Sequence, residues 1–577
     1  MQRSARRALG AALLLVLSAT LSAQAPGRFT SATSFAPCVR HLPIVASPIP
    51  SCFPSAAPPR PVPSLYDWSA WWFFNQDRFF DRVRIPVERP TPEQRDRIHA
   101  ALLLALDDAS PDTRAVAAVA VGKMQRSEDI EILKAAAADS HIAVRESACI
   151  ALGLLGNRSA EPFLTGVLGD TPAARRAFAR NGRPLFPSTR AFAALGLGLL
   201  FADAGDQTPP GTVTALQRLF ESSSGQSLDL QLAPVVALGV IRAPSAVPFL
   251  KDLVASRASP AWVRGHAVWA LARIEGVAAQ EFLLPYLRDK QFAVRQSVAL
   301  ALGRIVRPED DKAVKALRKL AWRGSGLAAR NFARLALGRI GGEGNDDILL
   351  RDLDRARRFE RTFGALALAV GFADEGAAVR SRIEAEAKER ITAAFRGAKR
   401  PHTLGACAVA LGILADAGAA PIVRKTLRRH LSAPWTGPLC LALGLLGDRD
   451  ALPDVRSVLR WNPDVDARRQ AALALGLIGG PEVLLDLAGE LQDPTNGPAV
   501  QGAVARAFAR IGGVLATEHL LALLTPAPSS TSTTRAAIVA AAGLLVDQQS
   551  PPRLRSVRED FNYLLRSDVL GRFLALL

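Results

Sequence analysis

A short apolar motif returns about thirteen times along this chain of 577 residues, and the repetition limits the folds open to it. One copy runs from Val144 to Gly153 and another from Val294 to Gly303. The closing Gly, or the Ala that replaces it, marks each unit, and most marks lie 31–35 residues apart. This period is typical of paired helices stacked in a solenoid. The marks are Gly122, Gly153, Gly198, Gly239, Ala272, Gly303, Gly338, Gly371, Gly412, Gly444, Gly476, Ala509 and Gly543.

Each unit indicates two helices of different character. The first is amphipathic, as in residues 246–253, where apolar side chains return every three or four positions. The second carries the Ala-rich motif, whose small side chains allow neighbouring helices to approach closely. Because a Gly inside a helix costs about 1 kcal/mol relative to Ala, the recurring Gly needs such a packing reason. The pattern predicts an all-α solenoid over residues 91–546, which grows by stacking rather than around one enlarging core.

The motif V-R-x-x-A-x-x-A-L-G-x-[LI], clearest at 144–156, 294–305 and 468–478, resembles the HEAT repeat in its HEAT-like or PBS-lyase-type variety. The resemblance implies about 13 antiparallel helix pairs, a right-handed superhelix and binding through the concave face. Residues 68–75 resemble a segment that precedes the repeats in exported bacterial HEAT-repeat proteins. Some relatives are bilin lyases or DNA-base glycosylases, but no catalytic motif of theirs is matched here.

The N-terminus has the pattern of a secretory signal peptide, residues 1–25. Arg3, Arg6 and Arg7 precede an apolar run of about 14 residues, which is short of the ~20 needed to cross a bilayer. An A-x-A site at 23–25 predicts a mature chain from Pro26 without a transmembrane span. We therefore expect an exported bacterial protein, periplasmic or extracellular.

Residues 26–64 are rich in Pro, Ser and Ala and indicate a linker or an arm laid over the first repeats. Cys38 and Cys52 lie in this stretch. In an exported protein they are candidates for a disulfide, worth about 3 kcal/mol for a loop of this length. Two free thiols are the alternative.

The densest aromatic cluster of the chain lies in residues 65–90. Trp68, Trp71 and Trp72 stand at the spacing of one helix face. We expect this segment to be an N-terminal cap on the open end of the solenoid, as terminal repeats require, with a ligand or glycan platform as the alternative. An amphipathic segment at 547–577 predicts a C-terminal capping helix.

Eight residues before the mark, an Arg recurs in eight units, and stacking would align these arginines in a row. One interpretation is a structural ladder of Arg to Asp, or to helix-end carbonyls, in the next unit. The other is a basic binding stripe on the concave face. The ladder residues are Arg114, Arg145, Arg190, Arg264, Arg295, Arg330, Arg468 and Arg535.

The net charge of the chain is +18, and loss of three arginines with the signal peptide leaves +15. Such a charge favours anionic partners, although it also fits arginines spread over solvated helix faces. The strongest basic patch lies where no acid occurs between Asp416 and Asp448. It is either an anion-binding site or a solvated outer face, and its residues are Arg424, Lys425, Arg428, Arg429 and His430.

No phosphate-binding G-x-x-x-x-G-K-[ST], no H-E-x-x-H and no C-x-x-C occurs in the sequence. We therefore predict no catalytic residue, no cofactor and no metal site. The leading hypothesis is an exported scaffold that binds partner proteins on the solenoid surface. A binder of anionic polymers or lipid headgroups through Arg-rich segments is one alternative, and an enzyme with a site in the groove is another.

Overall fold

The computed structural model describes residues 67–80, 82–83, 89–178, 182–223, 225–355, 358–373, 381–431, 433–525, 531–547, 555–558 and 561–576. All of these belong to one compact unit that spans residues 47–577. Within the described ranges every regular element is a helix, so the predicted all-α solenoid is confirmed. The predicted signal peptide, the Pro-rich linker and the candidate disulfide Cys38–Cys52 lie outside the described residues.

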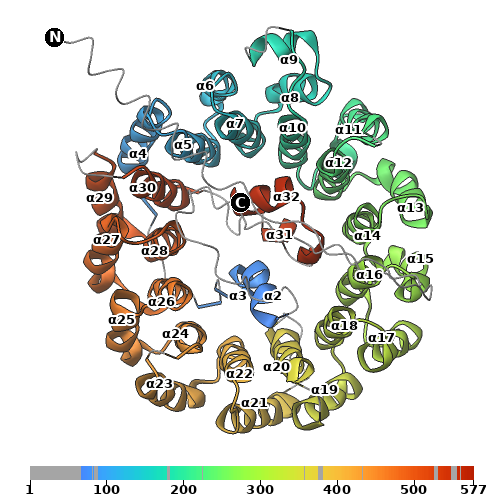
Figure 1. The fold of residues 1–577 in the computed structure, drawn as a ribbon, viewed down its shortest axis with the longest axis vertical. Coiled ribbons are helices and arrows are strands. Elements are labelled where there is room, and N and C mark those ends of the chain that lie inside the picture. The colour runs from blue at the N-terminus through green and yellow to red at the C-terminus, as the bar shows by residue number, and fades with distance from the viewer. Residues whose placement is uncertain are drawn as a thin grey trace, which may run out of the picture. The chain divides into compact units, whose positions relative to one another are not determined.

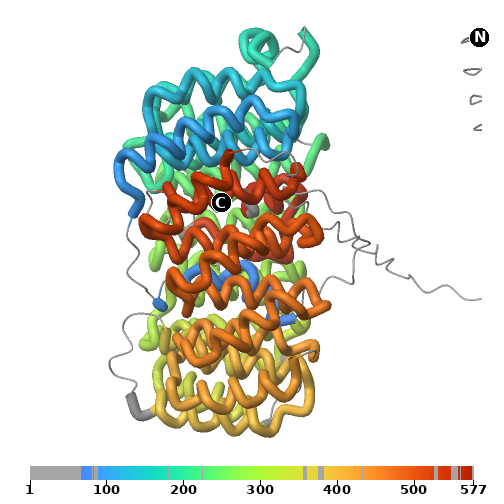
Figure 2. The backbone as a smooth tube through the Cα atoms, turned by 90° about the vertical axis from the view of Figure 1, so that its left-hand side faces the viewer, coloured from blue at the N-terminus to red at the C-terminus, as the bar shows by residue number. Residues whose placement is uncertain are grey.

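The helices form two concentric layers, seen end-on in Figure 1 and from the side in Figure 2. The inner layer consists of α5 (Pro111–Met124), α7 (Ile142–Leu155), α10 (Pro187–Leu200), α12 (Leu228–Ile241), α14 (Ala261–Glu275), α16 (Phe292–Ile305), α18 (Leu327–Ile340), α20 (Arg358–Ala373), α22 (Pro401–Ile413), α24 (Thr436–Leu445), α26 (Val465–Ile478), α28 (Pro498–Ile511) and α30 (Ser532–Leu545). Each of the thirteen sequence marks falls inside one of these helices, near its end.

The outer layer consists of the amphipathic helices that precede each inner helix. They are α4 (Pro92–Ala105), α6 (Ile130–Ala136), α8 (Glu161–Leu168), α11 (Pro210–Ser222), α13 (Val247–Ala255), α15 (Gln280–Leu283) continued by η6 (Leu284–Arg288), α17 (Asp311–Arg323), α19 (Glu343–Arg355), α21 (Ser381–Arg396), α23 (Ala420–Arg429), α25 (Leu452–Trp461), α27 (Leu484–Gln492) and α29 (Gly513–Leu524). A short further helix, α9 (Pro172–Ala177), lies in the longest unit.

Local sequence signals fix where these helices begin. Thr91 accepts a hydrogen bond from the Gln94 backbone N–H (3.2 Å), and the Gln94 side chain accepts one from the Thr91 N–H (3.1 Å). This reciprocal cap satisfies two of the donors that a helix start leaves unpaired. Pro92 follows at the first helical position, where its missing N–H costs nothing. Helix α4 therefore begins at Pro92.

The recurring Gly brings consecutive inner helices into backbone contact. A Cβ added to Gly303 in α16 would lie 2.7 Å from the Cα of Ala336 in α18. A Cβ on Gly476 in α26 would lie 2.7 Å from the Cα of Ala507 in α28. No side chain fits at these distances, so the Gly of these two units faces a small residue of the next.

The array closes into a ring, because α30 of the last pair packs against α5 of the first. The same close contact continues across the join, where a Cβ on Gly543 would lie 2.6 Å from the Cβ of Ala120. The expectation of an open superhelix with a cap at each end is therefore wrong. Thirteen pairs that each turn the chain by roughly 28° complete a circle, so no apolar end is left to cover.

The centre of the ring holds the segments expected to be caps, α2 (Trp68–Asn75), α3 (Asp77–Phe80), α31 (Arg555–Arg558) and α32 (Asp568–Leu576) (Figure 1). Helix α2 packs against α20 and α22, while α32 packs against α10 and α12. Both segments therefore contact repeats in the middle of the array. The apolar side chains that would have covered an end fill the lumen instead.

Replacing Gly303 by Ala should destabilise the protein, because α16 and α18 would have to separate to admit the methyl group. The expected cost is about 1–3 kcal/mol. Gly489→Ala in α27 is the matched control, since nothing lies within 4 Å of the added carbon and a gain of up to about 1 kcal/mol is expected. Thermal unfolding followed by circular dichroism compares the two. Equal melting temperatures would contradict the proposed role of the Gly.

The join of the ring can be tested through Arg535 in the last pair, whose guanidinium forms an ion pair with Asp108 of the first. Arg535→Met should cost about 1–3 kcal/mol, since it leaves the buried Asp108 carboxylate without its cation. Lys315→Met is the control, because the Lys315–Asp311 pair is exposed and should contribute less than about 0.5 kcal/mol. The free energy of unfolding in urea measures both effects. A loss for Arg535→Met no larger than the control's would show that this ion pair does not stabilise the join.

Candidate interaction surfaces

The N-terminal segment is anchored in the lumen by a buried aromatic cluster. Trp68, Trp71 and Trp72 are all buried, and the ring of Trp72 stacks on Phe79 at 5.6 Å between centroids. The Asp67 carboxylate meets the His402 imidazole of α22 at 2.6 Å. A platform for a ligand needs exposed ring faces, and these three indoles do not provide them.

The C-terminal segment lines the opposite side of the lumen. Phe561 packs on His266 and Trp269 of α14, with ring centroids 4.9 and 5.6 Å apart. Tyr563 contacts Phe332 of α18 edge-on and stacks on Phe74 of the N-terminal segment at 5.3 Å. The two ends of the described chain therefore meet in the centre.

Charged groups hold both segments to the ring and to each other. Arg558 forms an ion pair with Asp77 at 2.8 Å, joining the C-terminal to the N-terminal segment. Arg572 of α32 pairs with Glu146 of α7, and its guanidinium lies over Phe192 of α10. These contacts fix the orientation of the filling segments.

Burial shifts the titration of several groups around the lumen. It raises the pKa of Asp67 despite the neighbouring His402, and it raises the pKa of Glu146 despite Arg572. Burial also lowers the pKa of His266 to about 4, although its Nδ1–H donates to the Trp262 carbonyl at 2.8 Å. His266 is therefore neutral at physiological pH.

The eight ladder arginines lie in the first turns of inner helices, and their described contacts are with protein groups. Arg114 donates two hydrogen bonds to the Asp139 carboxylate, at 2.7 and 2.9 Å. Arg264 pairs with Asp289 at 2.6 Å, and in both cases the acid precedes the next inner helix. Burial of Asp139 would raise its pKa, but hydrogen bonds from Arg114 and the His141 N–H outweigh this and hold the pKa below its usual value.

The other ladder residues follow the same geometry. Arg330 pairs with Glu360 of α20 and Arg468 with Glu490 of α27, each in the next repeat. Arg145, Arg190 and Arg295 donate to carbonyls of helix ends, those of Asp139, Leu168 and Asp289. Arg535 pairs with Asp108 across the join. The ion-paired arginines fasten one repeat to the next, whereas these bonds of Arg145 and Arg190 tie an inner helix to the outer helix or turn of its own repeat. The row is therefore engaged in contacts within the protein and does not form a free basic stripe.

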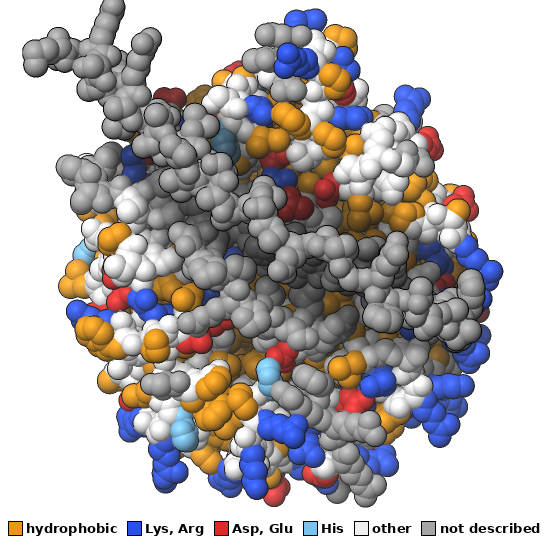
Figure 3. Space-filling view, in the orientation of Figure 1, with side chains coloured by type: hydrophobic (Ala, Val, Ile, Leu, Met, Phe, Trp, Pro, Cys, Tyr) orange, Lys and Arg blue, Asp and Glu red, His pale blue; other side chains and the backbone are white. Residues whose placement is uncertain are grey.

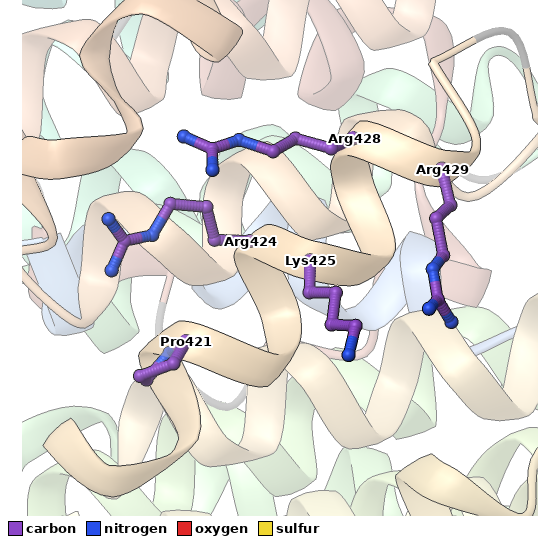
Figure 4. Close-up of a pocket in the computed structure, with 5 residues that line it drawn as sticks. All are labelled: Pro421, Arg424, Lys425, Arg428 and Arg429. Carbon is purple, nitrogen blue, oxygen red and sulfur yellow. The ribbon is translucent and has the colours of Figure 1, made fainter.

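The predicted basic patch lies on the outer helix α23, and Figure 4 shows that its side chains spread apart rather than converge. Arg424 pairs with Asp448 (3.1 Å) and Asp450 (2.8 Å). Arg428 pairs with Asp454 at 2.9 Å. Two of the four Lys and Arg side chains of the patch are thus neutralised by acids of the next repeat. The imidazole of His430 packs edge-on against Trp435.

The described cysteines are buried, and the described residues offer no cluster suited to metal binding. Cys149, Cys407 and Cys440 are buried, and burial raises the pKa of the Cys407 thiol to about 12. A thiol in this state is a poor nucleophile. No group of three or more His, Cys, Asp or Glu in the described ranges is arranged to hold a metal ion. Nor does any helix among these residues combine the length and apolar character needed to cross a membrane.

Comparison with known proteins now identifies the repeat. A family model described as HEAT repeats matches residues 100–181 and 254–338. The chain carries HEAT repeats. None of the curated proteins compared with it matches the sequence.

Solved structures similar to this chain include other helical-repeat proteins. Human deoxyhypusine hydroxylase is 20% identical over 56% of this chain and 98% of its own, with a TM-score of 0.22. Importin beta is 13% identical over 83% of this chain and 73% of its own, with a TM-score of 0.34. The karyopherin Kap121p bound to a SUMO protease is 14% identical over 75% and 47%, with a TM-score of 0.29. These similarities carry no partner or activity to this chain.

Sequence reasoning missed several residues that hold the centre of this HEAT ring together. Phe561 and Tyr563 belong to a segment without a repeat motif, so nothing in the pattern assigns them a neighbour. The Pro551-Pro552 pair marks the end of the array but not the direction the chain then takes. The aromatic content of residues 561–573 was the available signal, because one Tyr and two Phe in a short tail require an apolar surface to cover them.

The stability of the HEAT ring should fall as pH falls from about 6.5 to about 4, because His266 then takes up a proton in the unfolded chain but not in the folded one. A pKa shift of this size corresponds to a full loss of about 3 kcal/mol. His266→Leu should flatten this part of the pH profile, measured as the free energy of unfolding in urea at pH 7 and 5. His430→Leu, on the exposed surface, is the control. An unchanged pH slope in His266→Leu would show that other groups cause the acid sensitivity.

Proposed function

We propose that this chain is an exported scaffold that binds partner proteins through the outer helices and turns of its closed HEAT ring. One observation carries the proposal: the lumen, where a concave binding face would lie, is occupied by the chain's own residues 67–80, 555–558 and 561–576. The partner-binding surface that we propose therefore lies on the outer face of the ring. The signal-peptide pattern of residues 1–25 supports export.

The outside of the ring has apolar side chains that a partner could cover. Leu104 of α4, Trp461 at the end of α25 and Leu485 of α27 are each more than 70% exposed. Large exposed apolar groups near charged residues are typical of the centre of a protein interface. On the face shown in Figure 3, such hydrophobic side chains alternate with Lys and Arg, which gather toward the periphery.

The rigidity of a closed ring also favours a scaffold. Each inner helix is held on both sides by neighbours, and the ends of the array are joined. A surface fixed in this way loses little conformational entropy when a partner binds. The HEAT-repeat fold is itself typical of protein-interaction scaffolds.

The ten lysines of the chain provide a test, because nine lie on outer helices or in adjacent turns. Lys123 alone lies on an inner helix, where it is buried near Asp547. We expect a lysine-reactive crosslinker to join the mature chain from Pro26 to specific envelope proteins through the outer lysines. Mass spectrometry of the crosslinked peptides, at low and high salt, identifies both partners and sites.

Two controls give this experiment its meaning. The same chain denatured and captured in parallel reports nonspecific hydrophobic binding. Free polylysine reports capture by charge alone. Recovery of only anionic polymer or lipid, lost at high salt, would contradict the scaffold, as would a chain that captures no envelope component at either salt.

A further inference from the structure

One sector of the HEAT ring has a surplus of positive charge that its own acids do not balance. Residues 390–447 contain eight Lys or Arg and a single acid, Asp416. This segment spans the end of α21, the inner helix α22, the outer helix α23 and the whole of α24. The positive charge of the chain is therefore concentrated on neighbouring outer helices here.

The cations that point toward the next repeat are used inside the ring. Besides Arg424 and Arg428, Arg456 of α25 pairs with Asp486 of α27 at 2.9 Å. Helices α23 and α25 thus offer these arginines to acids of the repeat that follows. Such pairs orient the helices and leave little charge for a partner.

The cations on the other side of α23 have no such acid, because α21 ends in cations of its own. Figure 4 shows Lys425 and Arg429 pointing away from Arg424 and Arg428. Five exposed cations belong to this side of the sector: Arg396, Lys399, Arg400, Lys425 and Arg429. Among the described residues, none of the five forms an ion pair or a side-chain hydrogen bond.

An exposed indole extends this set. Arg396, Arg429 and Trp461 are the last residues of α21, α23 and α25, so they occupy equivalent positions in three consecutive repeats. The Asn462 side chain donates to the Leu431 carbonyl at 2.5 Å, which ties the end of α25 to the end of α23. Trp461 is 72% exposed and Leu431 is 39% exposed. Cations and apolar groups therefore share one edge of the ring.

We propose that this edge docks an acidic segment of a partner protein that carries an aromatic or aliphatic anchor. We call it the basic–aromatic row and define it as Arg396, Lys399, Arg400, Lys425, Arg429, Leu431 and Trp461. The cations match carboxylates, and Trp461 with Leu431 matches the anchor. The inference rests on the proposed scaffold function and names the chemistry of one partner.

Two observations favour a short acidic segment over a nucleic acid. The Arg460 guanidinium lies 5.0 Å from the centroid of the Trp461 ring, so it covers a face that a base would need for stacking. Asp450, just before the start of α25, has a 77% exposed carboxylate that would repel a polyanion spreading across the outer face of this sector. The chain's own residues 26–66 contain no Asp or Glu, so they lack the charge of the occupant.

The test is fluorescence anisotropy with the mature chain and a labelled synthetic peptide of about 15 residues that alternates Asp or Glu with Trp and Leu. The triple variant Arg396→Ser, Lys425→Ser, Arg429→Ser should weaken binding by at least about tenfold. Trp461→Ser should weaken it by about fivefold or more. The triple variant Lys312→Ser, Lys319→Ser, Arg323→Ser on α17 removes the same charge from exposed positions elsewhere on the ring and should change binding less than about twofold.

Further probes decide between occupants. A peptide with Ser in place of Trp and Leu should bind at least about fivefold more weakly; equal binding would overturn the role of the anchor. A DNA duplex or an anionic lipid vesicle that binds more tightly than the peptide, and is lost in the row variant, would make the row a polyanion site. Self-association that disappears in the row variant would make the occupant a second copy.

Crosslinking to partners and binding of the acidic peptide are independent measurements, so each can fail without the other. If crosslinking recovers the same partners with the row variant as with the unmodified chain, the scaffold stands and the row is not its docking surface. If no partner is recovered with either, while the peptide still binds the row, the scaffold fails instead.

Discussion

The contact between the Gly of one inner helix and a small residue of the next sets the geometry of this protein. At this contact the inner helices lie so close together that a side chain in place of the Gly would not fit, as where Gly303 faces Ala336. The outer helices bury larger groups, such as Leu317 and Leu320 of α17. Each pair is therefore a wedge that is narrow inside and wide outside. Repeated wedges curve the array, and the curvature brings Gly543 onto Ala120 and closes it.

Ring closure changes what the charged residues do. In an open solenoid the last Arg of the ladder would have no following repeat to pair with. In the closed ring, Arg535 forms an ion pair with Asp108 of the first helix pair. The ladder thus extends across the join, and the buried carboxylate of Asp108 keeps a cation there. Because a buried charge without a partner is costly, the ladder also selects the register in which repeats stack. Packing of small residues sets the distance between repeats, and the arginines set their alignment.

The fold could be predicted from the sequence because the period and the small residues are local signals. Closure of the ring could not be predicted in this way. The angle between successive helix pairs depends on a difference in size between the inner and outer contacts, and no single motif displays that difference. The aromatic segment shows the consequence. Trp68, Trp71 and Trp72 signal correctly that they must be buried, but an open end and a lumen both offer the apolar surface they need. Likewise, the basic run at 424–430 indicates charge, whereas the Asp448 and Asp454 that neutralise part of it lie some 25 residues away.

The filled lumen and the closed ring support one another, and together they direct binding outward. The lumen is filled by segments from both ends of the array, and Phe74 and Tyr563 stack where these segments meet. Displacing either segment would expose the apolar wall of the inner helices and remove an ion pair such as Arg558–Asp77. A partner that entered the lumen would have to replace all of these contacts before gaining any of its own. A partner on the outer helices displaces only water, so the free energy of the fold itself favours the outer surface for recognition.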